Sequence, residues 1–535
     1  MPDREIEVSA APQDFASMTV QTSQSYDALP YVSLPFPRTQ PSHLAAIGCM
    51  FAFEAVPIGK ARILELGCAA GGNIIPLAAR HPGAKIVGVD VSGVQIAAGQ
   101  SRISYLGLSN IDLTCRSLTD VDAGDGSFDY IICHGVYSWV SAPMREAILR
   151  VCRDRLSPRG IAMVSYNVLP GWRLMQVLRD CLLSFTGESD PRRRATEARE
   201  LIEMLSRTSP DKGAYRLALQ VGAERLGKST DDYIVHEFLD ETNEPCTFRD
   251  FVAACARHGL AYLAESELSS MIATNYPEEM RRVIHKVAQD RLFATEQFID
   301  MASGRLFRHS LLVGSEHVPM IDRRLSNERM EGMHFIGSPD LSLAVDENGG
   351  GVLVSSTGTK VSFGTAPLTD ALARFIAVFP GSSTVDDLMP ALPAGLRNVD
   401  GRALLREAML KLVLAGLANA STEPVPAAAA AGAKPFACPL VRADASRGEP
   451  LTANLRHEPV ELDTLAQHVL PLLDGSRDVD EVKASILQRL REGRLVFSRN
   501  DVDDDPNAQT RRVADRVNGL FSRFARGGLL RVHDK

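Results

Sequence analysis

The stretch RILELGCAAGGN, residues 62–73, decides the fold of this chain. Its first five residues form a short apolar run that ends in glycines, which is typical of a buried strand followed by a tight turn. Further apolar runs predict strands at 85–90, 111–115, 128–133 and 161–166, and the segments between them predict helices at 73–80, 92–105 and 143–156. Strand–helix alternation of this kind predicts an α/β fold, in which helices cover both faces of a mainly parallel, doubly wound sheet.

The glycines of the loop after the first strand indicate a nucleotide site. A bound nucleotide needs glycines here, because the backbone must turn sharply and approach the ligand closely. The dinucleotide-binding pattern G-x-G-x-x-G is absent, since Ala69 and Asn73 break its register. Instead, Glu65 precedes a G-x-x-x-G pattern formed by Gly67 and Gly71.

This arrangement resembles the first motif of class I S-adenosylmethionine-dependent methyltransferases, which have a Rossmann-like fold. Their cofactor carries a cationic sulfonium and a free amino group, so a nearby carboxylate such as Glu65 favours binding. The resemblance implies S-adenosyl-L-methionine as cofactor and S-adenosyl-L-homocysteine as product. The loop residues that it places against the cofactor are Gly67, Cys68, Ala69, Gly71 and Asn73.

The ends of the second and third predicted strands supply further cofactor contacts. Asp90 ends the second strand, where a carboxylate can accept hydrogen bonds from both ribose hydroxyls; the alternative is that it only caps the next helix. Val91 is predicted to cover the adenine. Many relatives carry an aspartate for the adenine amine after the third strand. Ser117 and Leu118 stand there in this chain, so Ser117 or a backbone group must make that contact.

The end of the fourth predicted strand, CHGVYSW at residues 133–139, is the candidate acceptor site. Amino-methylating enzymes often have a polar residue, two small residues and an aromatic residue here. His134 is predicted to orient the cofactor or relay a proton. Tyr137 and Trp139 are predicted to present their π faces to a methylsulfonium or an alkylammonium, with core packing as the alternative. Tyr166 and Asn167, at the end of the fifth strand, are predicted to complete the acceptor site.

Longer segments resemble the protein-lysine methyltransferases known from rickettsiae, which are bacteria. These segments are YDALPYVSLPFPRTQPSHLAAI (26–47), ELGCAAGGNIIPLA (65–78), DYIICHGVYSWV (129–140) and VSYNVLPGW (164–172). The segment YIVHEFL (233–239), with Asn243, Pro245 and Phe248, resembles the methyltransferase regulatory domain that accompanies them. The resemblance implies a protein substrate of the outer membrane or the secreted fraction, and a homodimer. Independently of the resemblance, we predict that Tyr26 and Tyr31 close over the cofactor.

The C-terminal third contains an internal near-repeat, residues 368–389 and 462–483, each followed by a helix and a short apolar ending. This order of elements resembles a winged-helix unit present twice. The predicted organisation is a loose leader (1–25), a cofactor-binding domain (26–180), a helical middle region with the regulatory domain (181–310), a first winged-helix-like unit with a β-hairpin (311–423), a Pro/Ala linker (424–435) and a second winged-helix-like unit (436–535).

Net charge, apolar runs and cysteine spacing exclude several kinds of partner and site. Lys+Arg 58 against Asp+Glu 66 gives a formal net charge of -8, which argues against a nucleic-acid partner. The acidic start lacks the pattern of a signal peptide, and the best apolar run, 44–53, is too short to span a bilayer, so no membrane insertion is predicted. The nine cysteines are scattered without a metal-ligand spacing, which predicts no metal site and a cytoplasmic setting.

Three functions fit these patterns. The first is a methyltransferase that N-methylates protein lysines by in-line displacement. The second is a small-molecule or peptide-tailoring methyltransferase. The third is a binding or regulatory protein that retains the fold without activity.

Overall fold

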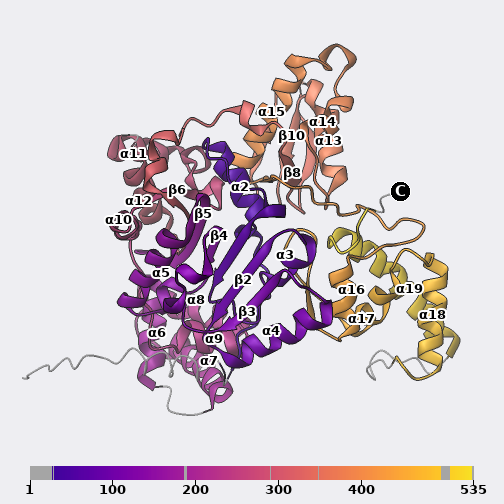
Figure 1. Cartoon of the computed structure of the whole chain (residues 1–535), viewed down its shortest axis with the longest axis horizontal. Helices are drawn as coiled ribbons and strands as arrows, with labels where there is room; N and C mark the ends of the chain where they lie inside the picture. The colour runs from indigo at the N-terminus through magenta and orange to yellow at the C-terminus, as the bar shows by residue number, and fades with distance from the viewer. Residues whose placement is uncertain are drawn as a thin grey trace, which may run out of the picture.

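The computed structural model describes residues 27, 29–185, 190–289, 291–347, 349–364, 366–495 and 506–532. The leader 1–25 and Tyr26 lie outside these described residues. A seven-stranded sheet forms the centre of the amino-terminal part of the molecule (Figure 1). Its strands are β1 (Arg62–Leu66), β2 (Lys85–Asp90), β3 (Ile111–Cys115), β4 (Phe128–Cys133), β5 (Leu156–Asn167), β6 (Leu260–Glu265) and β7 (Phe307–Gly314).

The strand order is β3-β2-β1-β4-β5-β7-β6. The five predicted strands pair in parallel, whereas β7 is antiparallel to both β5 and β6. The predicted fold class, a mainly parallel sheet of Rossmann-like type, is therefore confirmed. β6 and β7 come from the region that the sequence predicted as mostly helical, and the proposed limit at residue 310 falls inside β7.

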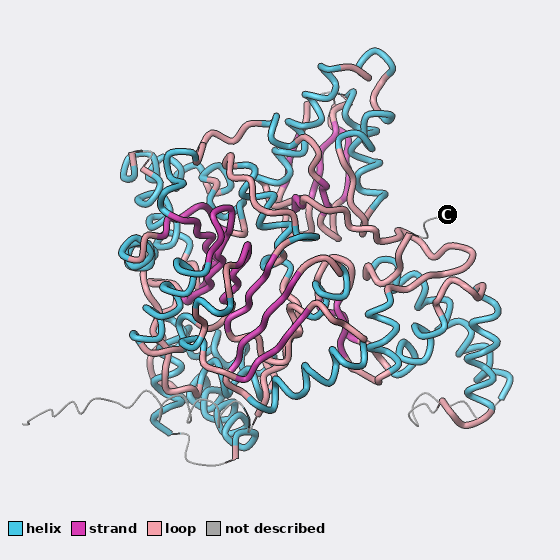
Figure 2. The backbone as a smooth tube through the Cα atoms, in the orientation of Figure 1, coloured by secondary structure: helices cyan, strands magenta, loops and turns pink. Residues whose placement is uncertain are grey.

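Helices cover both faces of the sheet, as Figure 2 shows. Successive residues of a strand point to opposite faces. Ile63 accordingly packs in one hydrophobic cluster with residues of α2 (Pro41–Met50), α3 (Ile75–Arg80) and α4 (Gly93–Leu106). Its neighbour Leu64 packs in another cluster, with residues of α5 (Ala142–Arg155) and α10 (Phe248–Arg257). Below, the first face is called the α2 face and the second the α5 face.

The middle region contributes the helices α6 (Arg173–Phe185), α7 (Pro191–Thr208), α8 (Ala214–Lys228), α9 (Asp231–Phe238), α11 (Glu278–Ala288) and α12 (Leu292–Ser303). Asp190 caps α7 by accepting hydrogen bonds from Arg192 N and Arg193 N, with Pro191 at the first turn. Trp172, Leu178, Ile202 and Phe238 share a separate hydrophobic cluster of this region. No helix in the described part of the chain combines the length and the apolar character needed to cross a bilayer.

The C-terminal third contains two groups of helices and short strands, one around each copy of the near-repeat. The first contains β8 (His334–Gly337), β9 (Ser342–Val345), β10 (Gly351–Val354), β11 (Lys360–Ser362), α13 (Thr369–Val378), α14 (Val385–Leu388), α15 (Val399–Leu414) and β12 (Ala418–Ser421). The second contains α16 (Pro439–Ser446), β13 (Leu451–Ala453), β14 (Pro459–Glu461), α17 (Thr464–Val469), α18 (Val479–Arg491) and α19 (Pro506–Arg526). The corresponding helices α14 and α18 both begin with a capping box, at Thr384 and Asp478.

The second unit lies beside α3 and α4 (Figure 1). Arg102 of α4 forms an ion pair with the buried Asp444 of α16, with 2.8 Å between Nη2 and Oδ2. The guanidinium of Arg447 lies over the ring of Tyr105, 5.0 Å from its centre. The second unit is thus attached to α4, the helix that follows β2 and Asp90.

Candidate functional site

The glycine loop turns tightly at the carboxyl end of β1. Gly67 and Gly71 both have a φ of 74°, in the left-handed region that favours glycine. Gly67 N donates to Val89 O at 2.9 Å, which ties the loop to the end of β2. A Cβ added to Gly67 would lie 2.4 Å from Cγ2 of Val136, which follows β4. The loop and the β4 end therefore approach each other so closely that only glycine fits.

Glu65 is buried beneath this loop with one carboxylate oxygen unsatisfied. Asn73 Nδ2 donates to Glu65 Oε1 at 2.7 Å, whereas Oε2 has no hydrogen-bond partner among the described residues. Burial raises the pKa of Glu65 to about 8, and the charge of nearby Asp90 acts in the same direction. A cationic amino group would satisfy the free oxygen. These residues fit a ligand such as S-adenosylmethionine.

Asp90 faces the same loop from the end of β2. Its Oδ2 accepts from Ala69 N at 2.8 Å and its Oδ1 accepts from Ser92 N at 2.9 Å. The side chain that caps α4 is Ser92, which accepts from Gln95 N. Asp90 is thus held by the backbone at the sheet edge where carboxyl ends of parallel strands meet, the usual place for nucleotide ligands.

The residues after β3 complete this edge. Arg116 N donates to Asp90 O at 2.9 Å, so the chain leaves β3 directly beside Asp90. Ser117 caps the 3₁₀ turn Leu118–Asp120 by accepting from Thr119 N. Val91 O lies 3.6 Å from Cys115 Sγ. The residues predicted to surround the adenosine are therefore close in space, and their contacts with it stay predictions.

The segment that precedes α2 lies across the glycine loop and α4. Its hydrogen bonds are Ser92 Oγ to Asp27 Oδ1 (2.6 Å), Gln95 Nε2 to Tyr31 O (2.8 Å), Gly72 N to Ser33 Oγ (2.7 Å) and Phe36 N to Asn73 Oδ1 (3.0 Å). Tyr31 also lies beside His236 of α9, with 5.8 Å between ring centres. This path favours the predicted closure of the segment over the cofactor.

A group of four rings gathers at the end of β4, on the α2 face. His134 stacks on His309 with ring centres 5.3 Å apart, meets the edge of Phe36 at 4.1 Å and lies 6.0 Å from Phe307. Burial lowers the pKa of His134 to about 4 and that of His309 well below its usual value, so both imidazoles are neutral. His134 Nδ1 is shielded and has no hydrogen-bond partner in the described part of the chain. These rings form an uncharged surface beside the glycine loop, and we call them the ring cluster.

Sequence reasoning missed three members of the ring cluster: Phe36, Phe307 and His309. Phe307 and His309 alternate along β7, the strand that was not predicted. In the β5–β7 register, Phe307 pairs with Asn167 and His309 pairs with Ser165. Asn167 therefore lies on the ring-cluster side of the sheet, and its Nδ2 has no partner among the described groups.

The other predicted acceptor residues lie in packed surroundings. Tyr166 is fully buried on the α5 face, where its ring stacks on Phe251 at 4.0 Å. Tyr137 is also buried and meets Phe251 edge-on at 5.4 Å. Trp139 lies under the guanidinium of Arg179, with 5.4 Å to the ring centre. These contacts favour the packing alternative for Tyr137 and Trp139, and Tyr166 is packed in the same way; the acceptor roles of all three residues stay predictions.

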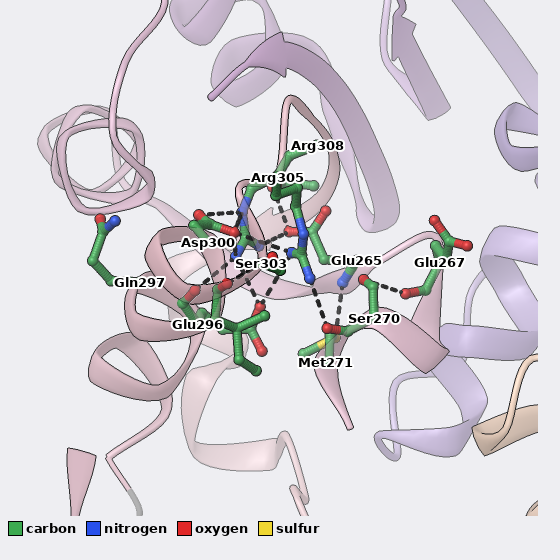
Figure 3. A network of polar contacts seen from close by, with 12 residues as sticks. Glu265, Glu267, Ser270, Met271, Glu296, Gln297, Asp300, Ser303, Arg305 and Arg308 are labelled. Atoms are coloured by element: carbon green, nitrogen blue, oxygen red, sulfur yellow. Dashed lines mark hydrogen bonds and ion pairs between the residues drawn. The ribbon is translucent and has the colours of Figure 1, made fainter. Parts of the chain in front are cut away.

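A buried ion network fixes β7 from the α5 face (Figure 3). Arg308, between Phe307 and His309, is fully buried. Its bonds are Nη1 to Glu265 Oε1 (2.7 Å), Nη2 to Glu296 Oε2 (3.0 Å), Nη2 to Asp300 Oδ1 (2.8 Å) and Nε to Asp300 Oδ2 (2.9 Å). Neighbours in a strand point to opposite faces, so Phe307 and His309 face the ring cluster while Arg308 faces the buried acids. The bonds of Arg308 therefore hold the strand that presents two members of the ring cluster.

Comparison with known proteins relates the whole chain to methyltransferases. Three family models match: "Methyltransferase domain" at residues 63–160, "Predicted methyltransferase regulatory domain" at 230–314 and "PKMT, C-terminal winged helix domain" at 433–529. The last match confirms the predicted winged-helix nature of the second C-terminal unit.

Proteins that are similar over most of this chain occur in rickettsiae. The uncharacterized protein RP789 of Rickettsia prowazekii is 32% identical over 530 residues, covering 96% of this chain and 94% of the relative. The solved structure of PKMT2 from Rickettsia typhi has a TM-score of 0.80 at 26% identity, covering 94% of this chain and 100% of that one. Its complex with AdoHcy has a TM-score of 0.81 at 25% identity, with the same coverage.

Proposed function

Because the chain belongs to the family of RP789 and is an S-adenosylmethionine-dependent methyltransferase, we propose that it N-methylates lysine side chains of a protein substrate. The observation that carries this proposal is the ring cluster, which offers an uncharged surface at the β4 end. A lysine ammonium has a pKa of about 10.4 in water and must lose its proton to solvent before it can react. A desolvated site of neutral imidazoles and phenyl rings lowers that pKa, because it disfavours the charged form.

In this proposal the cofactor is held at the carboxyl edge of β1, β2 and β3. Glu65 Oε2 accepts from the amino group, Asp90 accepts from the ribose hydroxyls, and Val91, Ser117 and Leu118 surround the adenine. When bound, S-adenosylmethionine supplies an electrophilic methyl group on a positively charged sulfur. The supports are the unsatisfied oxygen of Glu65 and the backbone-held carboxylate of Asp90.

The chain's residues mainly align the two reactants and exclude water. In the methyl transfer the lysine nitrogen forms a bond to the methyl carbon while the carbon–sulfur bond breaks and its electron pair stays on sulfur. Holding the lysine nitrogen at roughly 3 Å from the methyl carbon, in line with the sulfur, lowers the barrier to methyl transfer. The barrier falls because the two bound reactants no longer have to find that geometry by collision. Phe36 and Phe307 surround the neutral amine with apolar ring surface and exclude water from it. His134 Nδ1, which has no partner among the described groups, accepts a hydrogen bond from the amine.

A transfer assay tests the proposed reaction. The protein is incubated with methyl-labelled S-adenosylmethionine and fractions of bacterial cells, with excess S-adenosylhomocysteine as the inhibited control. We expect label in a protein band and methyl-lysine in its digest. Label confined to small solutes would support the tailoring alternative instead, and no label with any fraction would contradict both enzymatic functions.

The remaining partner assignments are part of this proposal. The substrate is proposed to be an outer-membrane or secreted protein that is modified in the cytoplasm, and the enzyme is proposed to be a homodimer. The PKMT name of the matched structure and of the winged-helix model supports a protein substrate. Isolating the labelled band and identifying the modified protein tests the substrate assignment directly.

Binding of S-adenosylhomocysteine at about pH 7 is expected to release protons from the protein. Burial raises the pKa of Glu65 to about 8, so its carboxyl is mainly protonated at that pH in the free protein. A cationic amino group beside it favours the carboxylate, so affinity rises with pH between about 6 and 8. Calorimetry in buffers of different ionisation enthalpy measures the released protons.

The matched variants for this test are Glu65→Gln and Glu54→Gln. The amide at position 65 still accepts from Asn73 but cannot titrate, so we expect the proton release to disappear. The side chain of Glu54 is exposed, and its variant should behave as wild type. Equal proton release by Glu65→Gln and wild type would exclude Glu65 as the titrating group.

A further inference from the structure

The second winged-helix unit contacts the glycine-loop region through one turn. The β13–β14 hairpin places His457 at its tip, with a φ of 64° and no exposed surface. Arg80 at the end of α3 donates to Leu455 O at 2.9 Å and to His457 Nδ1 at 2.5 Å. The hairpin therefore packs directly on the helix that follows the glycine loop.

The direction of each hydrogen bond in this contact is fixed by chemistry. An arginine can only donate, so His457 Nδ1 must be the acceptor. Burial together with the charge of Arg80 holds the pKa of His457 well below its usual value, so the imidazole carries one proton, on Nε2. Nε2 lies 2.9 Å from Asn73 Oδ1 and donates to it.

Asn73 passes this constraint to Glu65. Asn73 Oδ1 accepts from two N–H donors, His457 Nε2 (2.9 Å) and Phe36 N (3.0 Å), and the Thr39 hydroxyl, which shares its one proton with Phe36 O, lies 3.0 Å away. With its oxygen side fully occupied, the amide must turn Nδ2 toward Glu65, to which it donates at 2.7 Å. The occupied oxygen of Glu65 leaves Oε2 as the free one.

We propose that His457 is a positioning residue, through which the C-terminal winged-helix unit holds Asn73 and Glu65 in the geometry that binds the cofactor. The proposal rests on the proposed function, because it assigns Glu65 to the cofactor. His457 itself touches neither cofactor nor substrate. Cofactor binding thereby depends on His457, which lies 384 residues after Asn73 in the sequence.

The unit has other attachments, so the role of His457 can be separated from docking. The Arg102–Asp444 ion pair and the Arg447–Tyr105 contact link the same unit to α4. Neither involves Asn73. Changing His457 therefore should leave the unit in place, and changing Tyr105 disturbs the interface without touching the hydrogen-bond chain.

The test compares His457→Asn with His457→Gln. Asparagine tolerates the positive φ and can still accept from Arg80, but it ends too short of Asn73. Glutamine keeps a donor at the position of Nε2. Because His457→Asn loses one buried hydrogen bond, we expect it to bind S-adenosylhomocysteine roughly tenfold more weakly than wild type. We expect the affinities of His457→Gln and of the control Tyr105→Leu to stay within about threefold of wild type. Calorimetry measures the affinities, and thermal unfolding reports whether each variant is folded.

A double-mutant cycle separates positioning from general packing. If His457 acts through Asn73, then His457→Asn weakens binding no further in an Asn73→Ala background. Losses that multiply, or equal losses in the asparagine and glutamine variants, would overturn the proposal. Failure of the proposed function is distinguished by the wild-type protein, which would then bind no S-adenosylhomocysteine.

Discussion

An Asp90→Ala variant is expected to bind S-adenosylhomocysteine at least 100-fold more weakly than wild type. In the proposed complex the carboxylate accepts from two ribose hydroxyls. Each hydrogen bond to a charged group contributes about 1.5–3 kcal/mol, and 1.4 kcal/mol corresponds to tenfold in affinity. Loss of both therefore predicts about 100-fold or more. Calorimetry with the purified variant measures this change, and methyl transfer should fall with it.

A change on the ligand separates ribose recognition from loop geometry. Asp90 also accepts from Ala69 N and Ser92 N, so its removal loosens the loop as well. Wild type should discriminate strongly against a 2′-deoxy analogue of S-adenosylhomocysteine, whereas Asp90→Ala should not. Asp112→Ala removes an exposed carboxylate of β3 and is the matched control. If Asp90→Ala discriminates against the analogue as well as wild type does, another group reads the ribose.

The Arg308→Met variant is expected to lose about 3–5 kcal/mol of unfolding free energy, because it leaves buried carboxylates without their partner. Glu265, Glu296 and Asp300 all bond to this guanidinium, and all three are buried. Arg305 lies near Asp300, with 3.3 Å between Nη1 and Oδ1, and cannot replace a group that bonds to three acids at once. Urea unfolding at constant pH measures the loss.

The pH dependence of this loss identifies its cause. Burial raises the pKa of Glu296 to about 7, so the folded state takes up a proton that the unfolded state does not as the pH falls. An acid whose pKa is higher in the folded state stabilises that state at low pH and loses this contribution as the pH rises through the folded value. Without Arg308 the pKa of Glu296 in the folded state rises further, so the folded variant takes up more protons as the pH falls and is relatively more stable at low pH. The loss of unfolding free energy should therefore be larger at about pH 8 than at about pH 6.

The control for Arg308→Met is Arg153→Met. Arg153 and Glu316 form an exposed pair, with side chains 40% and 53% exposed, and such pairs contribute about 0–1 kcal/mol. Equal and pH-independent losses for the two variants would contradict the buried-charge explanation. Arg308 stands between Phe307 and His309 in β7 and holds that strand in place. The fraction of Arg308→Met that remains folded should therefore also bind a protein substrate poorly.

Much of the cofactor site could be predicted from the sequence. The strands at 62–66, 85–90, 111–115 and 128–133 were predicted with the ends that the structure shows, because short buried strands read as apolar runs. The position of Asp90 followed from the same pattern, since carboxyl ends of parallel strands meet at one edge. The sequence also predicted the winged-helix nature of the C-terminal unit, although it does not indicate which surface that unit contacts.

The acceptor side could not be predicted in the same way. β7 carries Arg308 and His309 inside a buried strand, so its sequence lacks the apolar pattern that would predict it. Tyr166 and Asn167 are neighbours, yet the first packs against Phe251 and the second pairs with Phe307. Which of two neighbours faces the site depends on the register between β5 and β7, and these strands are joined by a long segment.

The sequence by itself determined the fold class, the glycine loop and the acidic residues at its edge. These features depend on residues close together in the chain, whose spacing fixes their local structure. Only the tertiary structure decided that Phe36, Phe307 and His309 join His134, and that His457 reaches Asn73. Those contacts join residues far apart in the chain, and they form because burial of the sheet and docking of the C-terminal unit bring distant segments together.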